Sequence, residues 1–409
     1  MSAAPADAAS ASAPAPAPLA PLRQHLIAFP NGRLQLTIEA CHGEAEDLIG
    51  FAARANPRRA FLFLSKILGK HYPAHPAAMA AMHRWLADGI SASDGPIVFI
   101  GMAETATGLG QGVYEAWRDA HPAEKTLYLQ TTRYRIDAAA CLSFEESHSH
   151  APNIFLHLPR DAAHQACFAA ARRVVLIDDE LSTGNTFVNL LQALREVMPR
   201  LAAVHLATIC DFMGETRRRE LRARMHLPCS VTAAIRGDWR WQAADGDALA
   251  LAASAAAQCN YGHEVRLTDN GYGRLGRARR FDLPAALERR LAAERTEGPT
   301  LVLGCGEFMH ASFVLARALA AHGVDTAVQA TTRSPILIWG DVRHALTVPD
   351  PYGEGVPNYL YNVRPGQYGR VLICHETAAN PALYELARLV GGRLIQFLPG
   401  DYAEEIPVR

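Results

Sequence analysis

The chain has 409 residues, a length that predicts two or three domains, each able to bury its own core. Its 40 Lys and Arg residues balance 41 Asp and Glu residues, so no overall charge favours nucleic acid or an anionic membrane as a partner. The eight cysteines form no Cys-x-x-Cys pair, and no apolar run approaches the roughly 18 residues that span a bilayer. We therefore expect a cytoplasmic protein without a nucleic-acid or membrane partner.

Strands and helices alternate through the first half of the chain. Residues 1–22 are rich in Ala and Pro and are predicted to form a disordered tail. Strands are expected at 33–40, 96–100, 126–132, 153–158, 173–177 and 203–210, an apolar run covers 60–64, and helices are expected at 77–90, up to about 120, and at 186–197. This alternation predicts an α/β fold with a parallel, doubly wound sheet.

The alternation stops between residues 214 and 283. This segment contains a basic helix, two tryptophans, an Ala-rich helix and an arginine-rich strip, found at 217–224, Trp239 and Trp241, 247–257, and Arg274, Arg277, Arg279 and Arg280. Two interpretations remain open: a solvated helical insertion, or a cap whose arginines hold an anionic ligand. Residues 287–299 are charged and contain a glycine, so we expect a linker between a first domain at 23–286 and a second at 300–409.

Three short segments recur in the same order in the second half of the chain. Ile97-Val-Phe-Ile-Gly-Met-Ala-Glu matches Thr300-Leu-Val-Leu-Gly-Cys-Gly-Glu, Tyr128-Leu-Gln-Thr-Thr-Arg matches Val328-Gln-Ala-Thr-Thr-Arg, and Arg173-Val-Val-Leu-Ile-Asp-Asp matches Arg370-Val-Leu-Ile-Cys-His-Glu, with offsets of 203, 200 and 197. Any single match could arise by convergence of short strand motifs. Their ordered agreement predicts that the second, smaller α/β domain is a degenerate duplicate, in which Thr377-Ala-Ala-Asn-Pro has no glycine to match Gly184.

Two carboxylates and a hydroxyl-rich loop follow the apolar strand at 174–177. Asp178 and Asp179 come first, and Ser182, Thr183, Gly184, Asn185 and Thr186 lead into the next helix. Open α/β sheets bind ligands outside the carboxyl ends of their strands, and a glycine-bearing loop at a helix N-terminus offers N–H groups to a phosphate. Because the carboxylates can accept hydrogen bonds from vicinal hydroxyls, the pattern fits a ribose 5-phosphate group. An ordinary strand with a solvated turn is the alternative.

This order closely resembles the phosphoribosyl-pyrophosphate (PRPP) signature of type I phosphoribosyltransferases: an apolar strand, two acidic residues and Thr-Gly-x-Thr. Residues 23 to about 285 resemble proteins related to orotate phosphoribosyltransferase, and Thr332-Arg-Ser-Pro335 resembles the motif that names the TRSP domain. The resemblance implies PRPP as co-substrate, Mg²⁺ as cofactor and a nitrogenous, base-like acceptor. It also implies synthesis of a nucleoside-like metabolite beside other biosynthetic enzymes, in bacterial gene clusters associated with tellurium resistance and stress.

The resemblance assigns roles to particular residues. Asp178 and Asp179 would bind the ribose hydroxyls and hold Mg²⁺ mostly indirectly, through those hydroxyls and water, while residues 182–186 would hold the 5-phosphate. The loop after strand 96–100, with Ala103, Glu104 and Thr105, would hold the pyrophosphate; a carboxylate is unexpected there, so Glu104 would bind metal or order the loop. Segment 133–150 would form a flexible cover, with Arg133, His148 and His150 as catalytic candidates and solvated histidines as the alternative.

Some alternatives remain open. The retained acidic pair favours an enzyme, but a non-catalytic sensor of PRPP or a nucleotide is the alternative. Pro335 should end a strand and leave Thr332, Arg333 and Ser334 at its carboxyl end, which predicts a second anion site separate from the PRPP loop. A homodimer is compatible with the sequence, which does not predict the oligomeric state.

Overall fold

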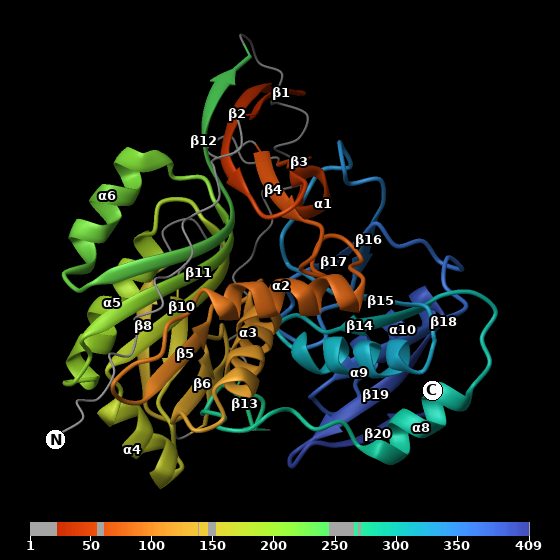
Figure 1. Ribbon diagram of the computed structural model, residues 1–409. Helices are drawn as coiled ribbons and strands as arrows, with labels where there is room; N and C mark the ends of the chain where they lie inside the picture. The colour runs from red at the N-terminus through yellow and green to blue at the C-terminus, as the bar shows by residue number, and fades with distance from the viewer. Residues whose placement is uncertain are drawn as a thin grey trace, which may run out of the picture.

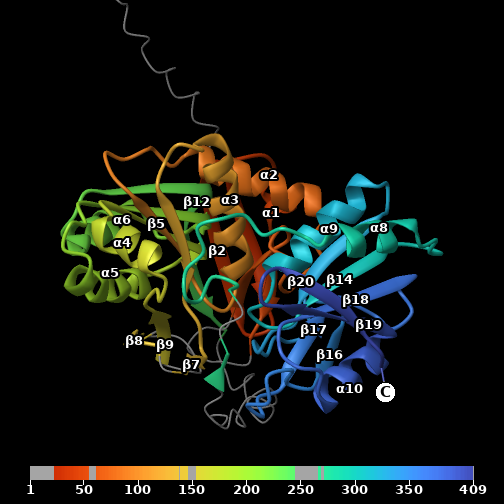
Figure 2. The ribbon, with the colours of Figure 1, turned by 90° about the horizontal axis from the view of Figure 1, so that it is seen from below.

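The computed structural model describes residues 23–54, 61–137, 139–145, 153–244, 266–268 and 271–408. Two α/β units lie side by side, each built on its own sheet, and the helices α2, α3 and α9 lie between them (Figures 1 and 2). The predicted tail, the Ala-rich helix at 247–257 and the histidines His148 and His150 lie outside the described residues. Within the described ranges, no helix has both the length and the apolar character needed to cross a membrane.

The first unit is built on a seven-stranded sheet in the order β1-β2-β12-β11-β10-β5-β6. The five strands from β12 to β6 are parallel, and β2 and β1 continue the sheet in antiparallel pairing. This arrangement confirms the predicted fold class. The strands are β1 (Arg23–Phe29), β2 (Gly32–Cys41), β5 (Ile97–Gly101), β6 (Thr126–Gln130), β10 (Arg173–Leu181), β11 (Ala203–Asp211) and β12 (Cys229–Ala243).

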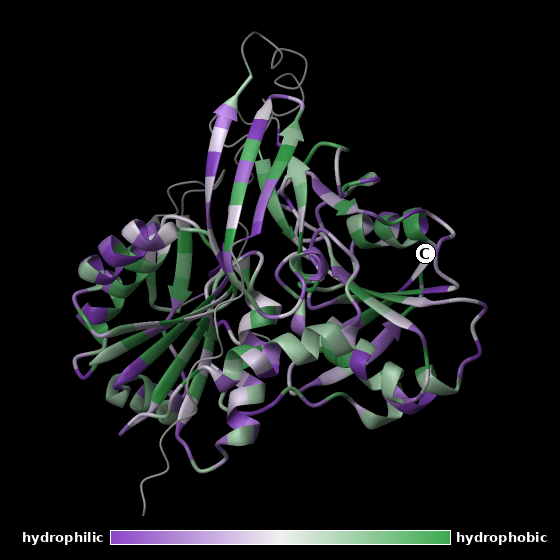
Figure 3. Cartoon of the chain, turned by 45° about the horizontal axis from the view of Figure 1, so that its top comes forward, coloured by the Kyte–Doolittle hydropathy of each residue, from purple (hydrophilic) through white to green (hydrophobic). Residues whose placement is uncertain are grey.

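Helices cover both faces of this sheet because the side chains of each strand alternate between the two faces. On β10, Val175 and Ile177 pack in the core that includes α2 and α3, whereas Val174 and Leu176 pack in the core that includes α4, α5 and α6. Parallel strands covered on both sides consist largely of apolar residues, which are green in Figure 3. The helices are α2 (Pro76–Asp88), α3 (Thr107–Ala120), α4 (Ala162–Ala170), α5 (Asn185–Val197) and α6 (Gly214–Met225).

Smaller elements decorate the first unit, and some differ from the sequence prediction. The strand expected at 153–158 is β9, which pairs with β8 in a hairpin and not with the main sheet. The tryptophans of the expected helical insertion lie on β12, a strand of the main sheet, so the helical interpretation is wrong for 229–243. The smaller elements are α1 (Ala45–Leu48), β3 (Ile49–Ala53), β4 (Phe61–Ser65), β7 (Arg135–Ile136), β8 (Cys141–Glu145), β9 (Asn153–His157) and β13 (Arg266–Leu267).

The second unit is a five-stranded sheet in the order β15-β14-β18-β19-β20, with only β20 antiparallel to its neighbour. Part of the expected linker at 287–299 is helical, because α8 extends to Ala293. The elements of this unit are β14 (Thr300–Gly304), β15 (Thr326–Ala330), β16 (Ala345–Val348), β17 (Asn358–Tyr361), β18 (Arg370–His375), β19 (Gly392–Leu398), β20 (Tyr402–Ile406), α8 (Ala285–Ala293), α9 (His310–Ala321) and α10 (Pro381–Val390).

The second sheet repeats the order and register of the first, as the internal repeat predicts. In the first unit Gly101 lies opposite Gln130 on β6 and Ile177 on β10. In the second unit Gly304 lies opposite Ala330 on β15 and Cys374 on β18. These pairs differ by the offsets of 203, 200 and 197 found in the sequence. The predicted strand order of the duplicate is therefore confirmed.

Each unit also covers the outer edge of the other unit's sheet. Tyr128 on β6, an edge strand, exchanges two backbone hydrogen bonds with Arg277, both 2.9 Å long. Val328 on β15, the corresponding edge strand, exchanges two with Ala74, at 2.8 and 2.9 Å. We call residues 69–74 and 273–277 the two arms. The arms cross between the units, so each sheet is completed by the other half of the chain.

Candidate functional site

The acidic pair lies at the carboxyl end of β10, as predicted, but the strand continues beyond it. Asp178 lies opposite Thr208 of β11, and pairing extends to Leu181. Both carboxylates are half-buried, and Asp178 Oδ1 accepts a hydrogen bond from the Asp179 N–H at 2.9 Å. The pair therefore remains accessible at the edge of the sheet where the phosphate loop begins.

The phosphate loop leads into a helix whose N-cap residue, a glycine, has no side chain to cap it. Gly184 is the N-cap of α5 and has a φ of 71°. The corresponding helix of the second unit, α10, is capped by Asn380, whose side chain accepts a hydrogen bond from the Leu383 N–H at 3.0 Å. Free N–H groups and the helix dipole attract anions, so α5 retains the anion-binding character that the Asn380 cap reduces in α10.

Gly184 is required by its neighbours as well as by its backbone conformation. A Cβ atom at this position would lie 2.5 Å from Cδ1 of Leu221, which projects from α6. The other loop residues are more open: Thr183 is exposed, and Ser182, Asn185 and Thr186 are half-buried. The Asn185 N–H donates to Thr183 Oγ1 at 3.4 Å. A side chain at 184 would therefore require the Leu221 side chain to shift.

The pyrophosphate loop predicted at 101–110 is shorter in the structure, because α3 begins at Thr107, and its residues 102–106 lie beside the phosphate loop. It follows β5, the neighbour of β10, and the Met102 N–H donates to Ile177 O at 2.9 Å. The Ala103 N–H donates to Thr131 Oγ1 at 2.7 Å, which ties the loop to the end of β6. Thr105 is half-buried in the same loop. The parallel strands thus bring the predicted phosphate and pyrophosphate loops to one edge of the sheet.

Glu104, the unexpected carboxylate of this loop, is held by cations. Its carboxylate lies 2.7 Å from Lys70 Nζ and 3.9 Å from Arg333 Nε. Burial raises the pKa of Glu104, but Lys70, Arg333 and Arg133 outweigh burial and lower the pKa to about 2. Of the two roles considered for Glu104, these contacts favour ordering of the loop.

A matching contact comes from the second unit. Glu307 occupies the position in β14's loop that Glu104 occupies in β5's loop, 203 residues earlier. Its carboxylate accepts hydrogen bonds from Thr132 Oγ1 at 2.6 Å and from the Arg133 N–H at 2.8 Å. Each Thr-Thr-Arg turn therefore contacts the glutamate of the other unit. The first turn donates through Thr132 Oγ1 and the Arg133 N–H, and the second contributes the Arg333 side chain. Arg133 lies at this junction between the units.

The TRSP motif lies at the same junction. Arg333 pairs with Glu104 and with Glu354, Ser334 N–H donates to Thr332 Oγ1 at 3.2 Å, and Ser334 Oγ accepts from Arg54 at 3.4 Å. The expectation that this motif lies apart from the PRPP loops is wrong, because Arg333 contacts the predicted pyrophosphate loop directly. An anion bound by Thr332, Arg333 and Ser334 remains a prediction, and it would compete with two carboxylates for Arg333.

The arginine-rich strip divides between two environments. Arg274 and Arg277 are buried, so the solvated interpretation is wrong for them, whereas Arg279 is exposed and Arg280 is half-buried. Arg274 pairs with Glu307 and Glu376, and Arg277 pairs with Asp401. These ion pairs anchor the arm at 273–277 to the second unit, and Arg274 also donates to Thr132 Oγ1 of the first unit at 3.2 Å.

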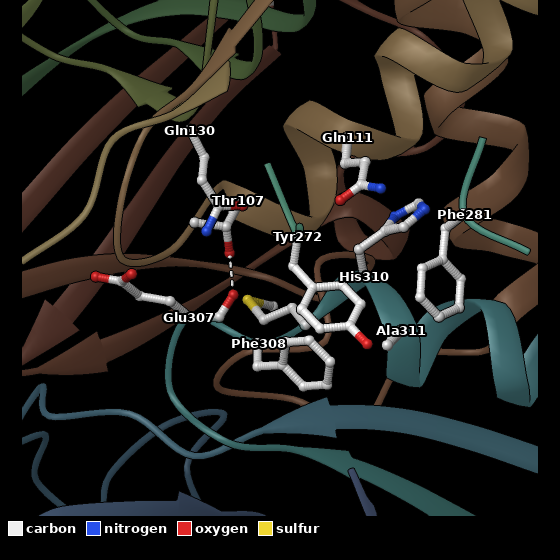
Figure 4. Close-up of a pocket in the computed structure, with 10 residues that line it drawn as sticks. Thr107, Gln111, Gln130, Tyr272, Phe281, Glu307, Phe308, His310 and Ala311 are labelled. Carbon is white, nitrogen blue, oxygen red and sulfur yellow. Dashed lines mark hydrogen bonds between the residues drawn. The ribbon is translucent and has the colours of Figure 1, made fainter. Parts of the chain in front are cut away.

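A cavity of about 10 Å³ lies between α3 and α9, a volume that holds about one water molecule. Thr107 Oγ1 donates to Glu307 O at 2.7 Å beside it, the contact drawn as a dashed line in Figure 4. His310 Nε2 lies 3.0 Å from Glu115 Oε1 along the same interface. This cavity is too small for a substrate, so the polar groups around it join the units.

Two segments of the chain match known protein families. Residues 48–238 match the family described as phosphoribosyl transferase, and residues 273–391 match the family described as the TRSP domain C-terminal to it. The two matches occur in the order that these descriptions state. Residues 48–238 therefore form a domain of this phosphoribosyltransferase family, and a TRSP domain follows it.

Solved structures of phosphoribosyltransferases are also similar. Adenine phosphoribosyltransferase from Rhodothermus marinus is 16% identical over 46% of this chain and 94% of that chain, with a TM-score of 0.31. The enzyme from Giardia lamblia, complexed with 9-deazaadenine, is 16% identical over 48% and 98%, with a TM-score of 0.33. Orotate phosphoribosyltransferase from Francisella tularensis is 15% identical over 38% and 66%, with a TM-score of 0.25. No curated protein matched the sequence.

In this phosphoribosyltransferase, sequence reasoning missed the residues that join the units. Glu307 could have been found, because the first repeat segment ends at Glu104 in one half and at Glu307 in the other. Lys70 carried only a weak signal, the Gly69-Lys70-His71 stretch after an apolar run. The TRSP match begins at residue 273, so it includes one arm and α8, which the sequence analysis assigned to the first domain and the linker.

Proposed function

We propose that the protein transfers a phosphoribosyl group from PRPP to a nitrogenous, base-like acceptor. The observation that carries the proposal is the combination of the Asp178–Asp179 pair with the uncapped N-terminus of α5. A phosphate at that helix and a ribose diol at those carboxylates would belong to one small molecule. The adjacent 102–106 loop supports a site for the pyrophosphate group on the same edge of the sheet.

Transfer breaks the bond between ribose C1 and pyrophosphate and builds positive charge on the ring, as in glycoside hydrolysis. In this proposal, residues 182–186 hold the 5-phosphate and fix the position of the ribose. Asp178 and Asp179 bind its hydroxyls, and their negative charge favours the developing cation. Arg133, His148 and His150 belong to the segment that covers the site and excludes water. The acceptor nitrogen then forms the new bond to C1.

The residues fit magnesium supplied with the substrate. Among the described residues, no group of three or more His, Cys, Asp or Glu side chains could hold a metal ion. Mg²⁺ commonly keeps several waters and binds through one or two carboxylates together with substrate phosphates. Asp178 and Asp179 would hold the ion in this way, mostly through the ribose hydroxyls and water. When bound, the ion would neutralise charge on the departing pyrophosphate.

The biological setting is part of the proposal. We infer synthesis of a nucleoside-like metabolite, in concert with other biosynthetic enzymes of tellurium-resistance and stress-associated clusters. A cytoplasmic location and a homodimer are consistent with this role.

A pyrophosphate-release assay tests the function. The protein is incubated with PRPP, Mg²⁺ and a panel of purine-, pyrimidine- and pyridine-type bases, and products are identified by mass spectrometry. An acceptor-dependent product that disappears with EDTA and returns with Mg²⁺ supports the proposal. Tight PRPP binding without turnover across the panel would favour the sensor alternative, and absence of PRPP binding would sink both.

A further inference from the structure

The loop at 102–106 is held from both units of the molecule. From its own unit, Thr131 Oγ1 accepts the Ala103 N–H at 2.7 Å, and Lys70 Nζ lies 2.7 Å from the Glu104 carboxylate. From the second unit, Arg333 approaches the same carboxylate. Lys70 is itself bound to the second unit, because its ammonium group donates to Gly306 O at 2.8 Å. The second unit therefore contacts this loop at Glu104, directly through Arg333 and indirectly through Lys70.

Arg333 is fixed in the orientation that reaches Glu104. Its guanidinium donates to Tyr134 Oη at 2.5 Å, lies 5.3 Å from the centroid of the Tyr134 ring, and pairs with Glu354. Tyr134 in turn stacks on Tyr352, with ring centroids 4.5 Å apart. Arginine presents several donors in a planar fork, so it can satisfy these partners together, whereas lysine is a single point charge.

The internal repeat shows that this contact is half of a reciprocal exchange. The second unit's Glu307 is held by Thr132 and Arg133, and the first unit's Glu104 is approached by Arg333, the counterpart of Arg133. Hydrogen bonds within the turns correspond as well: Tyr134 N–H donates to Thr132 Oγ1 at 3.1 Å, and Ser334 N–H donates to Thr332 Oγ1 at 3.2 Å. The TRSP turn of the second unit thus contacts the 102–106 loop of the first unit through Arg333.

We propose that Arg333 is a positioning residue of the phosphoribosyl-transfer site, which sets the 102–106 loop for the pyrophosphate group of PRPP through Glu104. The inference rests on the proposed function and deepens it. It assigns the TRSP motif to the same site as the PRPP signature. Because the 5-phosphate is bound elsewhere, by α5, Arg333 should affect recognition of pyrophosphate and not of ribose 5-phosphate.

Titration calorimetry with two ligands in the presence of Mg²⁺ separates recognition of the pyrophosphate group from recognition of ribose 5-phosphate. PRPP carries the pyrophosphate group, and ribose 5-phosphate lacks it. Arg333→Gln should raise the Kd for PRPP about tenfold, equivalent to the loss of one charge-assisted contact, and leave the Kd for ribose 5-phosphate within about twofold. Arg333→Lys should restore only part of the PRPP affinity. Arg393→Gln, which removes an ion-paired arginine on β19, is the matched control and should bind both probes like the wild type.

A conservative variant guards against loss of folding. Tyr134→Phe removes only the hydroxyl that orients Arg333, and it should weaken PRPP binding a few-fold with ribose 5-phosphate unchanged. Glu104→Gln should weaken PRPP binding as Arg333→Gln does, and the double variant should lose less than the two single losses combined. Equal weakening of both probes in Arg333→Gln and Tyr134→Phe, or wild-type PRPP affinity in both, would overturn the positioning role. A wild-type protein that binds neither probe would instead refute the proposed function.

Discussion

Arg274 forms a bidentate ion pair with Glu376, in which Nη1 donates to Oε2 at 2.7 Å and Nη2 donates to Oε1 at 2.8 Å. Glu376 occupies the register of Asp179 in the repeat, 197 residues later. A carboxylate that would face a sugar in the first unit is thus neutralised by an arginine in the second. At this position the duplicate has an ion pair with the arm at 273–277 where the first unit has a predicted ligand contact.

Loss of Arg274 should therefore destabilise the whole molecule. Arg274→Met leaves Glu307 and Glu376 buried without their main cationic partner, and breaking such a buried pair costs about 3–5 kcal/mol. Urea unfolding should show a lower midpoint for this variant. Arg23→Met, in an exposed ion pair with Glu44, should change the midpoint little. Similar midpoints for the two variants would contradict the structural role of Arg274.

Asp178→Asn should impair PRPP binding without unfolding the protein. The substitution keeps the shape of a half-buried side chain but replaces the carboxylate that would accept hydrogen bonds from the ribose hydroxyls. We expect the Kd for PRPP to rise about tenfold or more, the size of a lost hydrogen bond to a charged group. Asp179→Asn should have an effect of the same sign, whereas Asp282→Asn, in an exposed ion pair, should have none. Unchanged PRPP affinity in both Asp178→Asn and Asp179→Asn would show that the acidic pair does not bind PRPP.

Gly184→Ala should destabilise the protein through both the backbone conformation and the packing at this position. The positive φ costs an alanine about 1 kcal/mol, and the added Cβ meets Leu221. Leu221→Ala opens that space, so the double variant should be less destabilised than the sum of the two single variants. Thermal unfolding of the four proteins measures this coupling. Strict additivity would mean that the Leu221 contact is relieved without cost.

Glu354→Gln should remove a pH dependence near neutrality. Burial raises the pKa of Glu354 to about 7 despite the opposing effect of Arg333. Between the unfolded value of 4.5 and about 7, the folded protein holds a proton that the unfolded chain has lost, so this group reduces stability as the pH rises. The Tm of Glu354→Gln minus that of the wild type should therefore be a few degrees larger at pH 8 than at pH 5. An equal difference at both pH values would refute the assignment.

Much of the fold follows from local patterns in the sequence. Strands such as Ile97–Gly101 are buried on both faces, so their composition and spacing identify them without tertiary information. The register of the second sheet was also predictable, because the repeated segments keep nearly the same spacing along the chain in both halves. The residues after these strands, including Asp178 and Gly184, were recognised by their order alone.

The sequence was less informative where residues distant in the chain determine the structure. The strand β12 was mistaken for part of a helical insertion although Trp239 and Trp241 alternate with polar residues, which is a strand pattern. Its pairing with β2 is antiparallel and long-range, so the surrounding sequence did not identify its partner. Arg274 resembled a solvated residue because its partners lie 33 and 102 residues away. Similarly, nothing local indicates that Arg333 meets Glu104. Contacts between the units depend on the docking of two sheets, which short sequence patterns do not encode.

The crossing of the two arms has a consequence for any attempt to divide the chain. A fragment ending before residue 271 lacks the arm at 273–277, and the outer edge of β6 then offers the N–H groups of Tyr128 and Gln130 to other chains. A fragment beginning after residue 266 lacks residues 69–74 and exposes β15 at Val328 and Ala330 in the same way. Unpaired edge strands promote aggregation. Mixed together, the fragments should protect one another's edge strands, because each supplies the arm that the other lacks.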